Sequence, residues 1–296
     1  MNKIEQILFS NVGPEAARMA IINNAHLLIK AVQRRNPEWT PPPFDPMLYT
    51  SVMNIPVHYE NIPEEWDALY MPLPGRKKII VNKRIKSLGR RRFSLAHEIV
   101  HAWFEDPAGT RYVMRARNRR EYERDEAAQA LERCCDAGAA ELLMPQPWFG
   151  KELEKSVRKA AAVPKLAQVF EVSLEAAAMR MVESSDSPCG VGFFEFGPRP
   201  SENAAPLNNE GNTGTPRYRV RRLFKSAEFP FLFPAGKSVS EESVIYRCSL
   251  GPEEMSAVEE FHLGSHAARL HVSAFPLHRD NQIAGPPTVC AVFSPA

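Results

Sequence analysis

Two histidines and a glutamate carry the clearest chemical signal in the sequence: His97, Glu98 and His101 stand in the order His-Glu-x-x-His. On an α-helix, residues four apart lie on one face, with about 5–6 Å between their β-carbons. Both imidazoles can therefore reach a single Zn²⁺, whose bonds to nitrogen are about 2.0–2.1 Å long. Glu98, beside the first histidine, can act as a general base on water. The pattern predicts one catalytic zinc ion bound by His97 and His101, with Glu98 as the catalytic residue.

A catalytic zinc site also needs a third protein ligand and a position left open for water. Glu132 is the candidate, because it lies on the next predicted helix, which can pack antiparallel to the first. Two cysteine thiolates would instead favour a closed structural site. Four residues of the same segment are alternative ligands: Asp136, Glu141, Cys134 and Cys135.

Several helices and one strand must position these residues. Apolar residues with the period of an α-helix predict helices at about 14–34, 94–105 and 122–143. Residues 78–82, Lys-Ile-Ile-Val-Asn, have the composition of a strand. Because Ile79–Asn82 precedes the His-Glu-x-x-His helix, we expect this strand to pair with an extended substrate by strand addition.

The second half of the chain has a different pattern. Residues 197–216 are rich in Gly, Pro, Asn and Ser, which predicts a loop or linker. Around this segment, apolar residues recur with the period of a β-strand. Five strands are predicted, at 190–196, 218–223, 244–248, 268–273 and 288–293. A helical region followed by a β-rich region predicts an α+β fold.

The composition excludes some classes of protein. Hydrophobic residues make up 44% of the 296 residues and charged residues 24%, which is ordinary for a globular chain. No apolar run approaches the roughly 18–20 residues that span a bilayer. Residues 1–6 lack the pattern of a secretory signal, and five scattered cysteines do not suggest a disulfide framework. We therefore expect a reduced, cytoplasmic protein with no membrane partner.

The order of these motifs resembles the ImmA/IrrE family of metallopeptidases. The matching features are a strand, Arg-x-Phe-Ser-Leu-Ala-His-Glu-x-x-His, and then Glu-x-x-Cys-Asp with Leu-Leu-Met-Pro, over residues 75–185. The resemblance implies that His97, His101 and Glu132 bind the metal and that Glu98 is the catalytic acid and base.

The resemblance also implies a domain organisation. A zincin-like helical metallopeptidase domain would occupy residues 1–150, a helix-turn-helix-like extension 151–187, and a β-rich, GAF-like sensor domain 188–296. The family often has Asn where this chain has Asp136. Tyr122 lies in a run that resembles the one preceding the third ligand, and either lines the site or packs as an ordinary tyrosine.

Substrate and activator are implied by the resemblance alone. Peptidases of this family cut a cognate helix-turn-helix transcriptional repressor, and so relieve repression of a DNA-damage or phage-defence operon. Single-stranded DNA is the implied activator. The alternative from another functional class is a nucleic-acid-responsive regulator that acts by binding, with a non-proteolytic metal domain.

Two further features bear on nucleic acids. Residues 163–182, within a helical stretch at about 152–183, resemble a helix-turn-helix unit, but its second helix offers only Arg180 to phosphates, which favours helices that brace the peptidase domain. A basic cluster interleaved with aromatic residues suits single strands, whose bases stack and whose phosphates are neutralised. It comprises Arg217, Arg219, Arg221, Arg222 and Lys225, beside Phe224, Phe229, Phe231 and Phe233.

Overall fold

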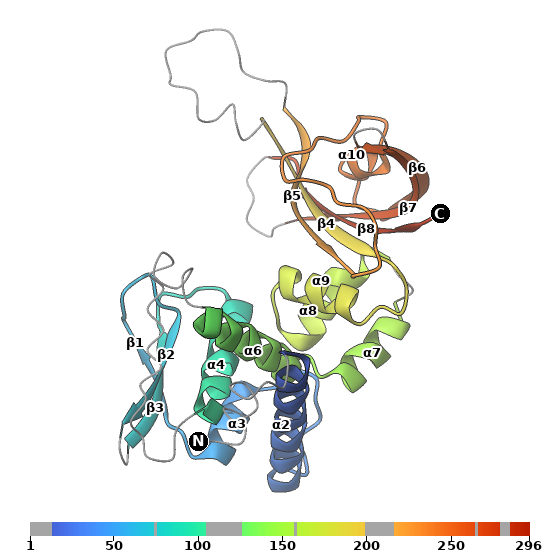
Figure 1. The fold of residues 1–296 in the computed structure, drawn as a ribbon. Coiled ribbons are helices and arrows are strands. Elements are labelled where there is room, and N and C mark those ends of the chain that lie inside the picture. The colour runs from blue at the N-terminus through green and yellow to red at the C-terminus, as the bar shows by residue number, and fades with distance from the viewer. Residues whose placement is uncertain are drawn as a thin grey trace, which may run out of the picture. The chain divides into compact units, whose positions relative to one another are not determined.

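A computed structural model of the chain forms two compact units (Figure 1). Unit 1 comprises Met1–Phe149 with Gln168–Ser173, and unit 2 comprises Gly150–Ala167 with Leu174–Ala296. The predicted separate extension, 151–187, is therefore divided between the two units. The structure describes residues 14–73, 76–104, 126–156, 159–198, 216–263, 266–278 and 285–296. Tyr122 and most of the predicted linker lie outside the described residues.

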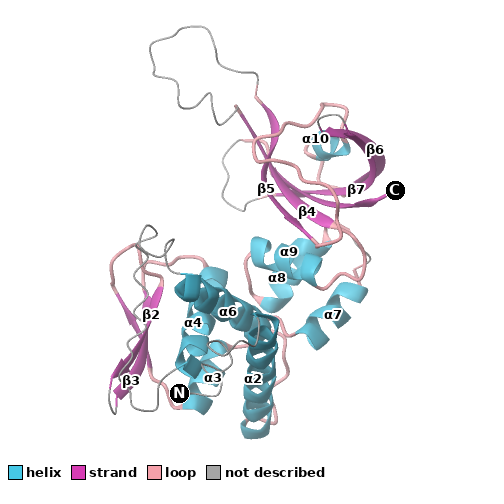
Figure 2. Cartoon of the chain, in the orientation of Figure 1, coloured by secondary structure: helices cyan, strands magenta, loops and turns pink. Residues whose placement is uncertain are grey.

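Unit 1 consists of helices and a three-stranded sheet (Figure 2). The helices are α2 (Pro14–Arg35), α3 (Pro46–Met53), α4 (Leu88–His101), the 3₁₀ turn η1 (Ala102–Phe104) and α6 (Glu126–Leu143), and α7 (Gln146–Glu154) begins in this unit. The strands are β1 (Val57–Glu60), β2 (Ala68–Leu73) and β3 (Arg76–Asn82). Helix α4 packs against β2 and β3 and also against α6, so it connects the sheet to the other helices.

The sheet order β1–β3–β2 corrects one expectation. Strand β3 is central: it pairs in parallel with β1 and antiparallel with β2. Its backbone groups are therefore used on both sides, and the prediction that Ile79–Asn82 receives a substrate strand is wrong. In the described part of unit 1, the edge strand that packs beside α4 is β2.

Local sequence explains where α4 begins and how closely α6 approaches it. Ser87 caps the start of α4, because its Oγ accepts a hydrogen bond from the backbone N–H of Arg90 at 3.3 Å. On α6, Gly138 faces the side chains of Val100 and Ile21. A β-carbon at position 138 would lie only 2.8 Å from a methyl group of each residue, so glycine permits this close approach. The α4–α6 contact brings the two predicted ligand helices together.

Unit 2 contains an antiparallel five-stranded sheet of order β5–β4–β8–β7–β6. The strands are β4 (Gly190–Gly197), β5 (Arg217–Lys225), β6 (Met255–Leu263), β7 (His266–Leu277) and β8 (Thr288–Pro295). The helices α9 (Leu174–Glu183) and α10 (Val244–Cys248) belong to this unit, as does most of α8 (Ala162–Phe170), whose last three residues are assigned to unit 1. Helix α9 packs on β4 and β5. The predicted boundary at 188 therefore falls inside unit 2. The α+β class is confirmed in its coarse form, a helical N-terminal region followed by a β-rich one.

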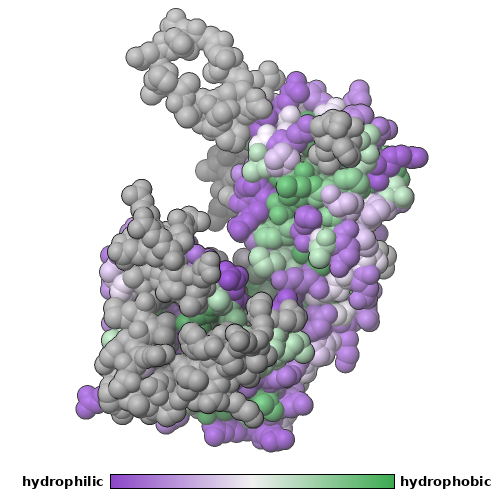
Figure 3. Space-filling model, viewed as in Figure 1, coloured by the Kyte–Doolittle hydropathy of each residue, from purple (hydrophilic) through white to green (hydrophobic). Residues whose placement is uncertain are grey.

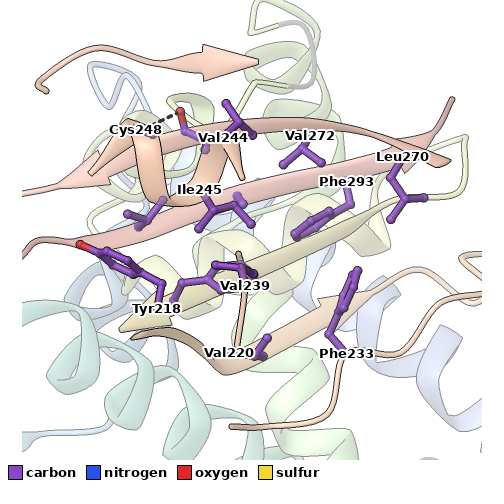
Figure 4. Packing of buried hydrophobic residues seen from close by; sticks show 14 of the residues in the cluster. Tyr218, Val220, Phe233, Val239, Val244, Ile245, Cys248, Leu270, Val272 and Phe293 are labelled. Atoms are coloured by element: carbon purple, nitrogen blue, oxygen red, sulfur yellow. Dashed lines mark hydrogen bonds between the residues drawn. The ribbon is translucent and has the colours of Figure 1, made fainter. Parts of the chain in front are cut away.

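The core of unit 2 lies between the sheet and α10 (Figure 4). Val244 and Ile245 of α10 are fully buried in the same hydrophobic cluster as Leu270 of β7 and Phe293 of β8. The segment 244–248 was predicted as a strand and is a helix. Ser243 provides the reason, because its Oγ accepts a hydrogen bond from the N–H of Ile245 at 3.3 Å and caps the helix.

The helices α8 and α9, in the segment that resembles a helix-turn-helix unit, are joined by residues 171–173. Glu171, between α8 and α9, has a left-handed φ of 51° and ends the first of the two helices. Arg180 is buried and lies 3.6 Å from Glu183 of the same helix, so it is not presented to phosphates. Helix α9 packs on β4 and β5 of unit 2, so a role in bracing the peptidase domain stays a prediction. Figure 3 shows an area of hydrophobic surface on unit 2. None of the described helices has the length and apolar character needed to cross a bilayer, and all five cysteines are free thiols.

Candidate metal centre

The two histidines of α4 converge in the interior of unit 1. His97 is 0% exposed and His101 is 2% exposed. They lie one helical turn apart, and their Nε2 atoms are 3.0 Å from each other. Two imidazole nitrogens at this distance point at the same small volume, as two ligands of one cation do.

Glu132 of α6 completes this arrangement. Its Oε2 lies 3.3 Å from Nε2 of His97, and its Oε1 lies 3.4 Å from Nε2 of His101. The Glu132 side chain is 14% exposed, so the site is close to the surface without being open. The structure thus brings together the three residues that the sequence proposed as ligands.

The distances between the donor atoms fit zinc. Bonds of about 2.0–2.2 Å in tetrahedral geometry place two donors about 3.3 Å apart. The three separations in the site, 3.0, 3.3 and 3.4 Å, are close to that value. Two imidazoles and one carboxylate also form a donor set of catalytic zinc sites, in which the fourth position takes water or substrate. His97, His101 and Glu132 therefore suit one Zn²⁺.

Cys135 defines a second possible ligand set. Ligand atoms of His97, His101 and Cys135 all lie within 4.8 Å of one another. However, Cys135 Sγ lies 3.6 Å from Nδ1 of His101, whereas Glu132 faces Nε2 of that ring. Burial is the main cause that raises the pKa of the Cys135 thiol well above its ordinary value, and the nearby carboxylates, Glu132 first, raise it further. The thiol is thus placed behind His101, on the side away from Glu132.

The other alternative ligands occupy different places. Asp136 Oδ1 lies 2.8 Å from Nδ1 of His97. Glu141 is buried near the end of α6, where Oε1 lies 2.7 Å from Nε2 of His26 and accepts a hydrogen bond from the N–H of Gln146. Cys134 is partly exposed. Neither Asp136 nor Glu141 shares the volume between the two Nε2 atoms.

Glu98 is oriented by the neighbouring strand. Its side chain is buried, and Oε2 accepts a hydrogen bond of 2.8 Å from the backbone N–H of Tyr70 in β2. Sequence reasoning did not anticipate this contact, because a backbone N–H of a distant strand leaves no mark in the residue types. This hydrogen bond holds the carboxylate of Glu98, the residue next to His97, toward the edge strand β2.

The geometry agrees with what the chain resembles. Residues 50–182 match peptidase family M78, the IrrE N-terminal-like domain. The matched segment contains His97, Glu98, His101 and Glu132. This segment of the chain is therefore similar to the metallopeptidase domain of the ImmA/IrrE family. The matched segment takes in the three-stranded sheet, α4, α6, α7 and α8 and nearly all of α9, whereas α2 lies before it.

Two curated relatives are radiation response metalloproteases IrrE. The chain is 29% identical over 182 residues to the protein from Deinococcus radiodurans, an alignment that covers 58% of this chain and 54% of the relative. It is 28% identical over 169 residues to the protein from Deinococcus deserti, covering 57% of this chain and 56% of the relative. The match thus spans about half the length of these relatives.

A solved structure resembles most of the chain in fold. A Mycobacterium tuberculosis transcriptional regulator aligns with a TM-score of 0.50 over 95% of this chain and 80% of the regulator. The sequence identity is 15%, so this likeness concerns the fold alone.

Proposed function

We propose that this chain is a cytoplasmic, zinc-dependent endopeptidase that makes a site-specific cut in a cognate helix-turn-helix transcriptional repressor. The cut would relieve repression of a DNA-damage or phage-defence operon. The observation that carries the proposal is the convergence of His97 Nε2, His101 Nε2 and Glu132 within 3.0–3.4 Å, beside the buried carboxylate of Glu98. The metalloprotease relatives support regulatory proteolysis as the class of function.

Each site residue then has a distinct task. His97, His101 and Glu132 would hold the ion. When bound, zinc supplies Lewis acidity toward a peptide carbonyl and toward water. Glu98 takes a proton from the attacking water and returns it to the leaving amine, as a general base and then a general acid. The N–H of Tyr70 keeps Oε2 of Glu98 in place during these transfers.

We place the substrate at β2 instead of β3. In an antiparallel pair, successive backbone N–H groups point alternately toward the partner strand and away from it. The N–H of Tyr70 reaches Glu98, so it points away from β3. Because the direction alternates along the strand, the backbone hydrogen-bonding groups of Ala68 and the carbonyl of Pro72 also point away from β3. An extended peptide that adds along this edge would lie next to Glu98.

The Tyr70 hydrogen bond can be tested with a matched pair of variants. Tyr70→Ala removes the side chain and keeps the N–H, whereas Tyr70→Pro removes both. Proline is tolerated on an edge strand when its missing N–H points away from the ladder, and Pro72 already occupies such a position. A hydrogen bond to a charged group contributes about 1.5–3 kcal/mol. We therefore expect kcat of Tyr70→Pro to be at least about tenfold below that of Tyr70→Ala.

Zinc content and melting temperature should be measured for both Tyr70 variants, so that the comparison uses folded, loaded protein. Equal kcat values for Tyr70→Ala and Tyr70→Pro would show that the N–H does not position Glu98.

The activator we propose is single-stranded DNA, bound by the basic strand β5. Arg221 lies over the ring of Phe193 at 5.7 Å, and Arg222 lies over Phe224 at 5.3 Å, so guanidinium groups and aromatic rings stand together on this strand and its neighbour. Single strands are bound by this combination of cationic and aromatic groups. Glu175 of α9 binds both guanidinium groups, at 2.7 and 3.0 Å. DNA phosphates would have to replace this carboxylate. A GAF-like sensor role for unit 2 is part of the same proposal.

A cleavage assay separates the proposed enzyme from a binding protein. The full chain is incubated with helix-turn-helix repressors encoded near its gene, with and without a chelator and a single-stranded oligonucleotide. We expect one discrete cut that the chelator abolishes and the oligonucleotide accelerates. Repressor or DNA binding without any cut, in zinc-loaded protein, would overturn the proposal in favour of the regulator that acts by binding.

A further inference from the structure

One face of α6 carries three side chains that meet the two histidines. Glu132, Cys135 and Asp136 are spaced i, i+3 and i+4, so they share that face. Glu132 approaches both rings at Nε2. Cys135 and Asp136 approach the opposite ring nitrogens, Nδ1 of His101 and Nδ1 of His97 respectively.

The geometry points to Asp136 as a positioning residue for His97, an inference that rests on the proposed metal-binding role of His97. A neutral imidazole carries its proton on one nitrogen and offers a lone pair on the other. With Asp136 Oδ1 at 2.8 Å, Nδ1 of His97 is the nitrogen that donates a proton. Nε2 then presents its lone pair to the volume it shares with His101 and Glu132. Carboxylates commonly fix metal-binding histidines in this way.

The two histidines are not supported equally. Behind His97 stands a carboxylate at 2.8 Å, whereas behind His101 stands a thiol at 3.6 Å. Sulfur is a weak hydrogen-bond acceptor, and a carboxylate oxygen is a strong one. Asp136 is therefore the outer partner whose loss should weaken zinc binding most.

The exposure of Asp136 allows the inference to be tested by mutation. The Asp136 side chain is 54% exposed, whereas the His97 side chain that it contacts is fully buried. Removing an exposed carboxylate leaves the core of unit 1 intact, so a loss of zinc affinity can be separated from unfolding. Arg133, also exposed on α6, offers a control position on the same helix.

The test is the zinc dissociation constant of the full chain, measured by competition with a chromophoric chelator. We expect Asp136→Ala to raise it about 10- to 100-fold. Asp136→Asn keeps an acceptor oxygen and should stay within about threefold of the wild type, as should Arg133→Ala. In nitrogen-15 spectra of labelled histidine, the Nδ1–H signal of His97 should change in Asp136→Ala and persist in Asp136→Asn.

Equal zinc affinity and an unchanged His97 signal in Asp136→Ala would overturn the inference and leave the proposed function standing. Failure of the wild type to bind zinc at all would instead overturn the proposed function. Because the readout is metal binding, it does not depend on knowing the substrate.

Discussion

Glu98→Gln is expected to retain zinc and to lose between about 10²- and 10⁴-fold in kcat, the range that general acid–base catalysis contributes. Glutamine has nearly the shape of glutamate, and its amide oxygen can still accept the hydrogen bond from the N–H of Tyr70. It cannot take a proton from water. The variant therefore separates proton transfer from metal binding and from packing. Zinc content and the cleavage rate are measured on the same preparation.

Glu141→Gln is the matched control for this prediction. Glu141 is also a buried glutamate with a backbone hydrogen bond, but it lies near the end of α6, beside His26. Its replacement should leave kcat unchanged. A Glu98→Gln variant that cuts the repressor within threefold of the wild-type rate would remove Glu98 from the mechanism.

Glu132→Ala is expected to weaken zinc binding by more than the roughly 10- to 100-fold loss that an outer partner causes. It removes the only oxygen ligand proposed for the site and leaves two imidazoles. The loss should also appear in thermal unfolding, because a bound ligand stabilises the folded state in proportion to the logarithm of its concentration relative to its dissociation constant. Zinc should raise the melting temperature of the wild type and not that of Glu132→Ala.

Cys135→Ser provides the opposite comparison. If Cys135 only stands behind His101, the serine variant keeps its zinc and the zinc-dependent rise in melting temperature. The reverse pattern, with zinc lost in Cys135→Ser and kept in Glu132→Ala, would assign the third ligand to the thiol.

The sequence predicted the two helices that carry the site better than it predicted which side chains of these helices meet. The helix predicted at about 94–105 overlaps α4, which begins earlier, at Leu88, and ends at His101. The helix predicted at 122–143 overlaps α6, which ends at Leu143 as predicted. Spacing alone left Glu132, Asp136 and Cys135 as competing ligands. Only the packing of α6 on α4, helped by Gly138, shows which ring nitrogen each one meets.

Sheet pairing was less predictable, because it depends on segments far apart in the sequence. Strands β1 and β2 were not predicted: Val57–Glu60 is short, and Ala68–Leu73 contains a proline. Because neither neighbouring strand was predicted, β3 was wrongly expected to be an edge strand that binds the substrate. In unit 2, β6 was missed because the acidic residues Glu259 and Glu260 interrupt its apolar pattern. The β-branched residues of 244–248 suggested a strand, and the Ser243 cap decided for a helix.

The proposed peptidase mechanism depends on one zinc ion held by two imidazole nitrogens and a carboxylate, with a place left for water. X-ray absorption at the zinc edge of the loaded full chain tests this directly. It should show only nitrogen and oxygen neighbours at about 2.0–2.2 Å. A sulfur neighbour at about 2.3 Å would place Cys135 on the metal and contradict the proposed site.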